Sequence, residues 1–255
     1  MNFVNEPFNV QHLYGVYVLS GTVVKTDSGY RPGSYTDKDH HGLSADGQTK
    51  CEAAGLLYKQ NSNLNFVASG SVLPIIGETD LSSAPSYAEV YALELQKNGI
   101  PANQIIQSNK PIDSITELIS LVQITADNNW TNVLIISNQS QIERVKILYD
   151  MVWNYPLPGS TTQTDLNRLS IMLFTNRILA RNENIVTADY LKSLIKLRQR
   201  NFKAVITTSE GIIIQQNPET NELFEKIYKT MQMQQRFEME KKGVKHIVDG
   251  TYYLD

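Results

Sequence analysis

The sequence predicts an α/β fold in which helices cover both faces of a parallel sheet, and three observations support this. Within the first 150 residues, short β-branched runs alternate with segments whose apolar residues recur at helical spacing. The run Val133–Ile136 is uninterrupted by polar residues, as in a strand covered on both faces. Three helix starts carry the Ser-x-x-Glu pattern of a capping box, namely Ser86/Glu89, Ser114/Glu117 and Ser140/Glu143.

Four strand–loop–helix units follow from these patterns. Strands are expected at 14–20, 65–69, 104–107 and 133–137, and helices near 47–60, 86–98, 114–126 and from Ile142 onward. We expect strands 14–20 and 65–69 to be adjacent and parallel. The loops 20–46, 69–86, 107–114 and 137–141 then lie at one edge of the sheet, where folds of this class bind ligands.

The chain after residue 150 has a different character. The segment "WNYPLPGSTTQTD" reads as a linker or lid because it is rich in proline and small polar residues. Further strands are expected at 169–174, 203–208, 211–215 and 244–248, and helices at 187–200 and 219–241. Residues 1–150 are thus predicted to form the sheet domain. Residues 151–255 either complete the sheet or form a small second lobe.

Composition excludes several classes of protein. The 23 basic and 26 acidic residues form no basic stripe, so a nucleic-acid partner is disfavoured. A single cysteine, Cys51, excludes an internal disulfide framework and fits a reducing compartment. No window approaches the ~20 apolar residues of a membrane span, so we expect a cytoplasmic protein. The oligomeric state stays open.

The segment 132–149, "NVLIISNQSQIERVKILY", carries the strongest indication of a binding site. Polar residues including Asn138 stand where a buried strand passes into a helix. Gln141 and Arg144 are three positions apart, so they share one helix face. The first helical N–H groups are unpaired and the helix dipole is positive there. We therefore expect an anionic or polar ligand at this turn, with Arg144 directed towards it.

The remaining candidates each admit two interpretations. Gly21 and Gly70 either approach a phosphate or form plain turns. Lys50 and Arg144 each either bind a phosphate or carboxylate or are solvated or ion-paired surface charges, and the surface charge is favoured for Lys50. Ser20, Ser69 and Ser137 end strands, but none lies in a G-x-S-x-G elbow. His40 and His41 stand among aspartates in the first loop, a composition that fits a metal site or, as we favour, a polar loop without metal.

Five segments resemble the YdcF-like family, which includes SanA- and ElyC-type envelope proteins, in their order and spacing. They are "VLSG" (18–21), "LSADGQTKCEAAGLLY" (43–58), "FVASGS" (66–71), "SYAEVYALELQKNGIPANQII" (86–106) and the segment 132–149. The resemblance covers residues 14–150 and implies a Rossmann-like fold with a ligand crevice. One member is associated with S-adenosylmethionine, so that cofactor is possible here, and others with envelope polysaccharide metabolism.

The residues that match the family pattern are Gly21, Ser69, Gly70, Glu89, Ser137 and Arg144, and Ser114 and Glu117 are kept in a third region. Lys50 replaces an arginine, Ser71 a glycine, Gln141 a histidine and Leu118 an asparagine. Because a glutamine side chain does not titrate, any catalysis would rest on Glu89 or Asp113.

The expected function is binding of a nucleotide-like or phosphorylated small molecule, of the S-adenosylmethionine or sugar-nucleotide type, with or without catalysis. The alternative is a catalytically silent binding or regulatory protein that keeps the fold. The expected ligand-binding residues are Ser20, Gly21, Lys50, Ser69, Gly70, Glu89, Ser114, Ser137, Asn138, Gln141 and Arg144. No metal site is expected. The long loop 21–46 should fold over the ligand as a mobile flap.

Overall fold

The computed structural model describes residues 7–37, 46–155, 187–241, 244–248 and 251–254, with side chains described as far as residue 231. Its centre is a five-stranded sheet in the order β5-β4-β1-β6-β7, in which every neighbouring pair is parallel. The strands are β1 (Gly15–Val18), β4 (Asn65–Ser69), β5 (Ile105–Ser108), β6 (Asn132–Ser137) and β7 (Lys203–Thr208). The predicted α/β parallel sheet, with the first two predicted strands adjacent, is confirmed.

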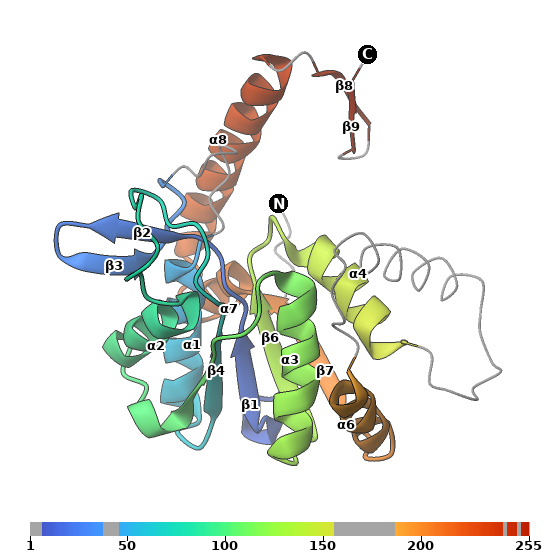
Figure 1. Ribbon diagram of the computed structural model, residues 1–255. Helices are drawn as coiled ribbons and strands as arrows, with labels where there is room; N and C mark the ends of the chain where they lie inside the picture. Colours follow the sequence, from blue (N-terminus) through green and yellow to red (C-terminus); the bar gives the residue numbers. More distant parts are fainter. Residues whose placement is uncertain (1–6, 38–45, 156–186, 242–243, 249–250, 255) are drawn as a thin grey trace.

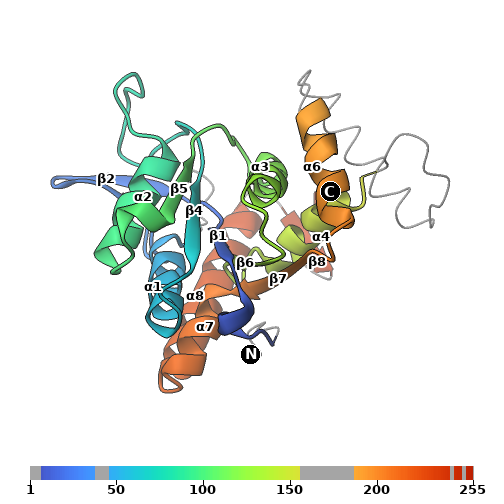
Figure 2. The same ribbon diagram turned by 90° about the horizontal axis from the view of Figure 1, so that it is seen from below.

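Helices cover both faces of this sheet (Figures 1 and 2). One layer holds α1 (Gln48–Gln60), α2 (Tyr87–Lys97) and α7 (Ser209–Gln216), and the other holds α3 (Ser114–Asp127), α4 (Ile142–Trp153) and α6 (Ala188–Arg198). The short strand β1 serves both cores. Val16 and Val18 point into the first core and Tyr17 into the second, because successive side chains of a strand alternate between faces.

The first loop contains a hairpin that the sequence analysis missed. Its strands β2 (Val23–Thr26) and β3 (Gly29–Pro32) pair antiparallel, and Gly29 has φ +117° at the turn. Lys25 forms an ion pair with Glu78 at 2.7 Å, which joins the hairpin to the loop after β4. The expected mobility of this flap stays a prediction. Residues 38–45, which include His40 and His41, lie outside the described residues.

Residues beyond 150 supply β7, the fifth strand of the main sheet. The predicted strand at 211–215 is wrong, because these residues belong to α7. The Thr208 side chain accepts the Gly211 N–H and so starts a helix, and the apolar run that follows packs into the core in helical form. The predicted strand at 169–174 lies outside the described residues.

The long helix α8 (Thr220–Lys241) extends away from the sheet, and β8 (Val244–Val248) and β9 (Thr251–Leu254) form a separate antiparallel hairpin (Figure 1). Phe224 and Tyr228, near the start of α8, are buried against the body of the protein. Among the described residues, no helix combines the length and the apolar character needed to cross a membrane.

Candidate functional site

Four polar or small residues lie side by side where the parallel strands end. Val18 pairs with Ala68 on one side and with Ile136 on the other. Two residues further along, Ser20 therefore lies between Gly70 and Asn138. A Cβ added to Gly70 would come within 3.4 Å of Ser20 Oγ, and Asn138 Nδ2 donates to Ser209 Oγ at 3.2 Å. We call Gly70, Ser20, Asn138 and Ser209 the strand-end row.

The sheet's connections diverge in the middle of this row. The chain leaves β1 towards α1 on one face and leaves β6 towards α4 on the other face (Figure 2). In open α/β sheets, ligands bind where neighbouring connections part in this way, beyond the carboxyl ends of the strands. Here that position lies between Ser20 and Asn138.

Two buried charged side chains hold the backbone of Ser20. The Ser20 N–H donates to Glu117 Oε1 at 2.8 Å, and Lys50 Nζ donates to the Ser20 carbonyl at 3.1 Å. Lys50 comes from α1 and Glu117 from α3, so they reach Ser20 from opposite faces of the sheet. The next amide, Gly21 N–H, donates to Tyr91 Oη at 2.7 Å. The backbone that follows β1 is therefore fixed by side chains from three helices.

Burial sets the protonation behaviour of these groups. Lys50 is 2% exposed and Glu117 is 3% exposed. Loss of hydration lowers the pKa of Lys50 and raises the pKa of Glu117, while attraction between the two opposite charges opposes both shifts. The interpretation of Lys50 as a solvated surface charge is thus wrong. Its side chain turns inward from α1 because the Ser20 carbonyl offers it an acceptor there.

Ser69 and Ser137 lie one layer below the row and are also buried. Ser69 Oγ accepts the Tyr17 hydroxyl at 3.2 Å, and the Ser137 carbonyl accepts the Ser209 hydroxyl at 3.3 Å. These predicted site residues thus adjoin the row but face into the protein.

The loop between β6 and α4 is held by residues from the C-terminal part of the chain. Gln139 N–H donates to the Glu210 carboxylate at 3.2 Å, and Ser140 N–H donates to Tyr228 Oη at 2.7 Å. Tyr228 in turn donates to Glu210 Oε1 at 3.0 Å, and the Tyr35 hydroxyl contacts the same oxygen. Glu210 is fully buried. The roles of Glu210, Tyr228 and Tyr35 could not be predicted from the sequence, because no local pattern indicates a contact between positions so far apart.

The start of α4 differs from the expected capping box at Ser140 and Glu143, and that prediction is wrong. The helix begins at Ile142 with Gln141 as its N-cap, and the Gln141 side chain makes no capping hydrogen bond. Ser140 N–H is instead drawn to Tyr228, which shifts the helix start by one residue. Arg144, exposed on the first turn, donates to Ser114 Oγ at 3.3 Å, so two predicted site residues meet.

Glu89 and Asp113, the catalytic candidates, have structural roles in the described chain. Glu89 Oε2 accepts the Ser86 N–H at 2.7 Å, which completes the predicted capping box of α2. Asp113 is the N-cap of α3 and forms a box with Thr116, so the box predicted at Ser114 and Glu117 is wrong by one residue. This shift frees Glu117 from a capping role and directs it to Ser20.

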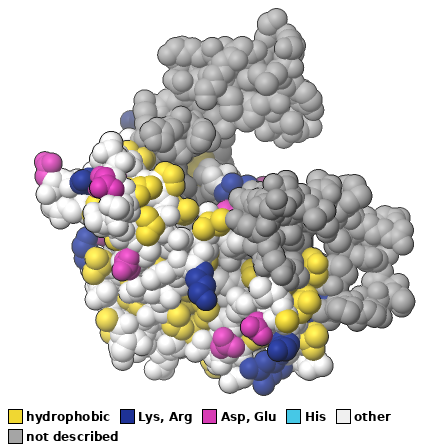
Figure 3. All heavy atoms as spheres, viewed as in Figure 1, with side chains coloured by type: hydrophobic (Ala, Val, Ile, Leu, Met, Phe, Trp, Pro, Cys, Tyr) yellow, Lys and Arg dark blue, Asp and Glu magenta, His cyan; other side chains and the backbone are white. Residues whose placement is uncertain are grey.

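A metal centre is not formed by the described residues, among which no group of three His, Cys, Asp or Glu side chains could hold an ion. Asp37, from the histidine-containing loop, forms an ion pair with Arg31 at 2.7 Å. On the face shown in Figure 3, basic and acidic side chains are interspersed.

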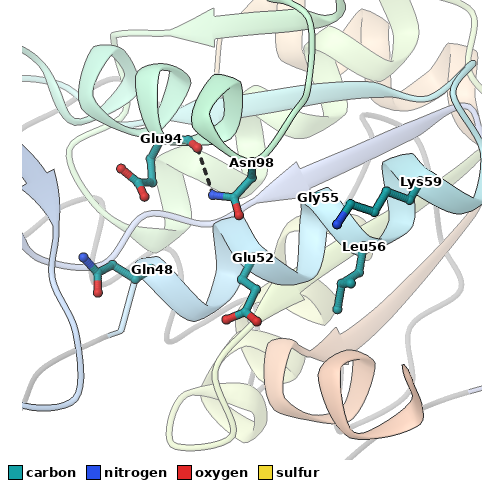
Figure 4. A pocket seen from close by; sticks show the side chains of 7 residues that line it. All are labelled: Gln48, Glu52, Gly55, Leu56, Lys59, Glu94 and Asn98. Carbon is teal, nitrogen blue, oxygen red and sulfur yellow. Dashed lines mark hydrogen bonds between the residues drawn. The ribbon is translucent and has the colours of Figure 1, made fainter. Parts of the chain in front are cut away.

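A separate groove of about 440 Å³ lies between α1 and α2 (Figure 4). Its lining is Gln48, Glu52, Gly55, Leu56, Lys59, Glu94 and Asn98. A Cβ on Gly55 would come within 2.8 Å of the Asn98 carbonyl oxygen, so the glycine permits the close packing of the two helices. The groove is lined mainly by polar side chains and contains none of the predicted site residues.

Comparison with family models, with curated proteins and with solved structures found no match to this chain.

Proposed function

We propose that the strand-end row and the start of α4 bind a nucleotide-like or phosphorylated small molecule. The observation that carries this proposal is the fixation of Ser20, whose N–H and carbonyl are both bound by buried charged side chains at the point where the connections part. Burying charged groups costs stability, and such groups concentrate at functional sites. A loop held in one conformation before binding also loses little entropy when the ligand arrives.

The anionic part of the ligand is assigned to the first turn of α4. That turn has no side-chain cap from Gln141, and the positive end of the helix dipole favours an anion. Arg144 stands on the same turn, and it can donate two parallel hydrogen bonds to a phosphate. Its contact with Ser114 holds the guanidinium over the space between the starts of α3 and α4.

Binding is better supported than catalysis. Glu89 and Asp113 are engaged in helix caps, and Gln141 has no titrating group. The carboxyl group beside the row is Glu117, whose raised pKa suits proton transfer and favours the catalytic version of the function. The alternative remains a catalytically silent binding or regulatory protein. Product analysis after incubation with the tightest-binding compound separates the two versions.

Two further attributes belong to the same proposal. The resemblance to the YdcF-like family makes S-adenosylmethionine and sugar nucleotides the first compounds to test. The buried, unpaired Cys51 suits the reducing cytoplasm, where we place the protein.

The testing experiment is a thermal-shift panel of inorganic phosphate, nucleotides, sugar nucleotides and S-adenosylmethionine, followed by calorimetric titration of the best compound. We expect Arg144→Ala to weaken its binding roughly ten- to a hundredfold, since a charge-assisted hydrogen bond contributes about 1.5–3 kcal/mol. The matched control is Arg200→Ala, because Arg200 is also exposed and bonded to a neutral side chain, Asn129 Oδ1. Equal affinity of both variants would contradict the assignment.

A further inference from the structure

The side-chain amide of Asn138 is satisfied at one end and unsatisfied at the other. Its Nδ2 donates to Ser209 Oγ at 3.2 Å, whereas Oδ1 accepts no hydrogen bond although the residue is fully buried. Within the part of the chain that the structure describes, no other buried side-chain N or O atom lacks a partner in this way. Such an acceptor costs stability, and its presence in a native protein calls for an explanation.

Neighbouring donors of the protein are already used elsewhere. The Ser209 hydroxyl donates to Glu210 or to the Ser137 carbonyl, and the Gln139 N–H donates to Glu210. The Ser20 N–H, on the adjacent strand end, donates to Glu117. Asn138 Oδ1 therefore lies in the middle of the strand-end row, where these neighbouring donors already bond to other acceptors.

The loop that follows Asn138 reaches the protein surface within two residues. Gln139 is half-buried and Ser140 is exposed. Their amides are held by Glu210 and by Tyr228, which are side chains, and not by the strand ladder. This loop can shift while the pairing of β6 with β1 and β7 stays intact.

We infer that Asn138 Oδ1 accepts a hydrogen bond from a sugar hydroxyl of the ligand, which makes the ligand a phosphorylated sugar or nucleoside. This inference rests on the proposed function and narrows it. A fully ionised phosphate group carries no hydrogen to donate, so it cannot satisfy this acceptor. The phosphate at the start of α4 and the hydroxyl at Asn138 are then two parts of one molecule.

The first arm of the test measures the stability of the ligand-free protein. Asn138→Leu removes the unpartnered acceptor together with the one hydrogen bond to Ser209, whose hydroxyl keeps its own acceptors, so the two effects oppose and we expect little change in Tm. The control is Asn61→Leu, since Asn61 is buried with Nδ2 bonded to the Val10 carbonyl and Oδ1 bonded to the Asn63 N–H. The control should lower Tm by about 4 °C or more. An equal loss in Asn138→Leu would make Asn138 a structural residue and overturn the inference.

The second arm measures binding of AMP, 2′-deoxy-AMP, 3′-deoxy-AMP and inorganic phosphate by calorimetry. The wild-type protein should bind AMP about tenfold more tightly than one of the deoxy compounds, and Asn138→Leu should abolish this preference. Phosphate should bind the wild-type protein and Asn138→Leu equally. A wild-type protein without the preference, or a variant that retains it, overturns the inference.

The two proposals fail differently. Loss of phosphate binding in Arg144→Ala, without any preference for a hydroxyl, would leave the proposed function standing and refute the role of Asn138. Failure of all four compounds to bind, together with failure of the sugar nucleotides and S-adenosylmethionine of the thermal-shift panel, would refute both proposals.

Discussion

Lys50 and Glu117 bind the carbonyl and the amide of one residue, Ser20, from opposite faces of the sheet. The two side chains come from α1 and α3, which lie in different layers and share no core. They meet only at the end of β1. This arrangement joins the two layers of the fold at the position where we place the ligand.

The hydrogen bond from Ser20 to Glu117 should stabilise the fold measurably. Glu117→Ala removes the acceptor of the partly buried Ser20 N–H, so we expect the free energy of unfolding to fall by about 1–3 kcal/mol. Glu117→Gln keeps a carbonyl oxygen at the same position and should lose less. Chemical denaturation of both variants tests this expectation, and equal losses would show that the acceptor at Glu117 does not matter.

Charge coupling between Lys50 and Glu117 should appear in a double-mutant cycle. Lys50→Met and Glu117→Gln each leave the other charge without its opposite, so the double variant should be less destabilised than the sum of the single variants. A coupling of about 0.5–3 kcal/mol is typical of residues in one network. Strictly additive losses would argue against the coupling.

Stability should depend on pH through Lys50. Burial lowers its pKa below the ordinary value of 10.5, so between the lowered value and 10.5 the unfolded chain binds more protons than the folded protein. The free energy of unfolding contributed by this group therefore rises as pH rises through that window. We expect wild-type protein to gain stability relative to Lys50→Met between neutral pH and pH 10.5, as followed by urea denaturation. A difference in the free energy of unfolding between wild-type protein and Lys50→Met that does not change with pH would contradict the lowered pKa of Lys50.

The tyrosine of α8 should control the loop between β6 and α4. Tyr228→Phe removes the acceptor of Ser140 N–H and one donor to Glu210, at a cost of about 1 kcal/mol. Hydrogen exchange at the Ser140 amide should become faster than in the wild-type protein. Tyr149→Phe is the control, because that hydroxyl makes no hydrogen bond to a described residue. Similar exchange rates at the Ser140 amide in the two variants would show that Tyr228 of α8 does not control the loop between β6 and α4.

Ser86 and Glu89 should act on stability alone. Ser86→Ala removes the N-cap of α2 and should cost about 0.5–2 kcal/mol of unfolding free energy. Ligand affinity should stay unchanged, since Ser86 Oγ and Glu89 Oε2 bond to each other and to the backbone of the capping box. Calorimetric titration beside denaturation checks both statements. A tenfold loss of ligand affinity in Ser86→Ala would show that the start of α2, including Glu89, contributes to ligand binding.

Local patterns were sufficient to predict most of the sheet. Strands β4 and β7 have the predicted bounds, and β6 differs by one residue, because each contains three or more consecutive apolar residues rich in β-branched or aromatic types. The run in 211–215 is equally apolar but too short to distinguish a strand from a buried helix. The hairpin β2–β3 was missed because its glycine and aspartate were read as features of an unstructured loop.

The sequence predicted the position of the candidate site at the ends of the strands, but not the side chains that hold its backbone. Strand-end residues such as Ser20, Gly70 and Asn138 come together because parallel strands bring their carboxyl ends to one edge. The roles of Glu117 and Glu210 depend on contacts across 97 and 71 positions of the chain. Local sequence periodicity does not indicate such contacts, so the roles of these two side chains could be assigned only from the structure.

The most direct test of the ligand site is a titration of ¹⁵N-labelled protein with AMP, followed by backbone amide shifts. We expect the largest changes at the carboxyl ends of β1, β4 and β6, namely at Ser20, Gly21, Gly70, Asn138, Gln139 and Ser140. Amides in the groove between α1 and α2 should change little, which provides the internal control. Changes confined to that groove, or an unchanged spectrum at saturating AMP, would contradict a binding site at the strand-end row.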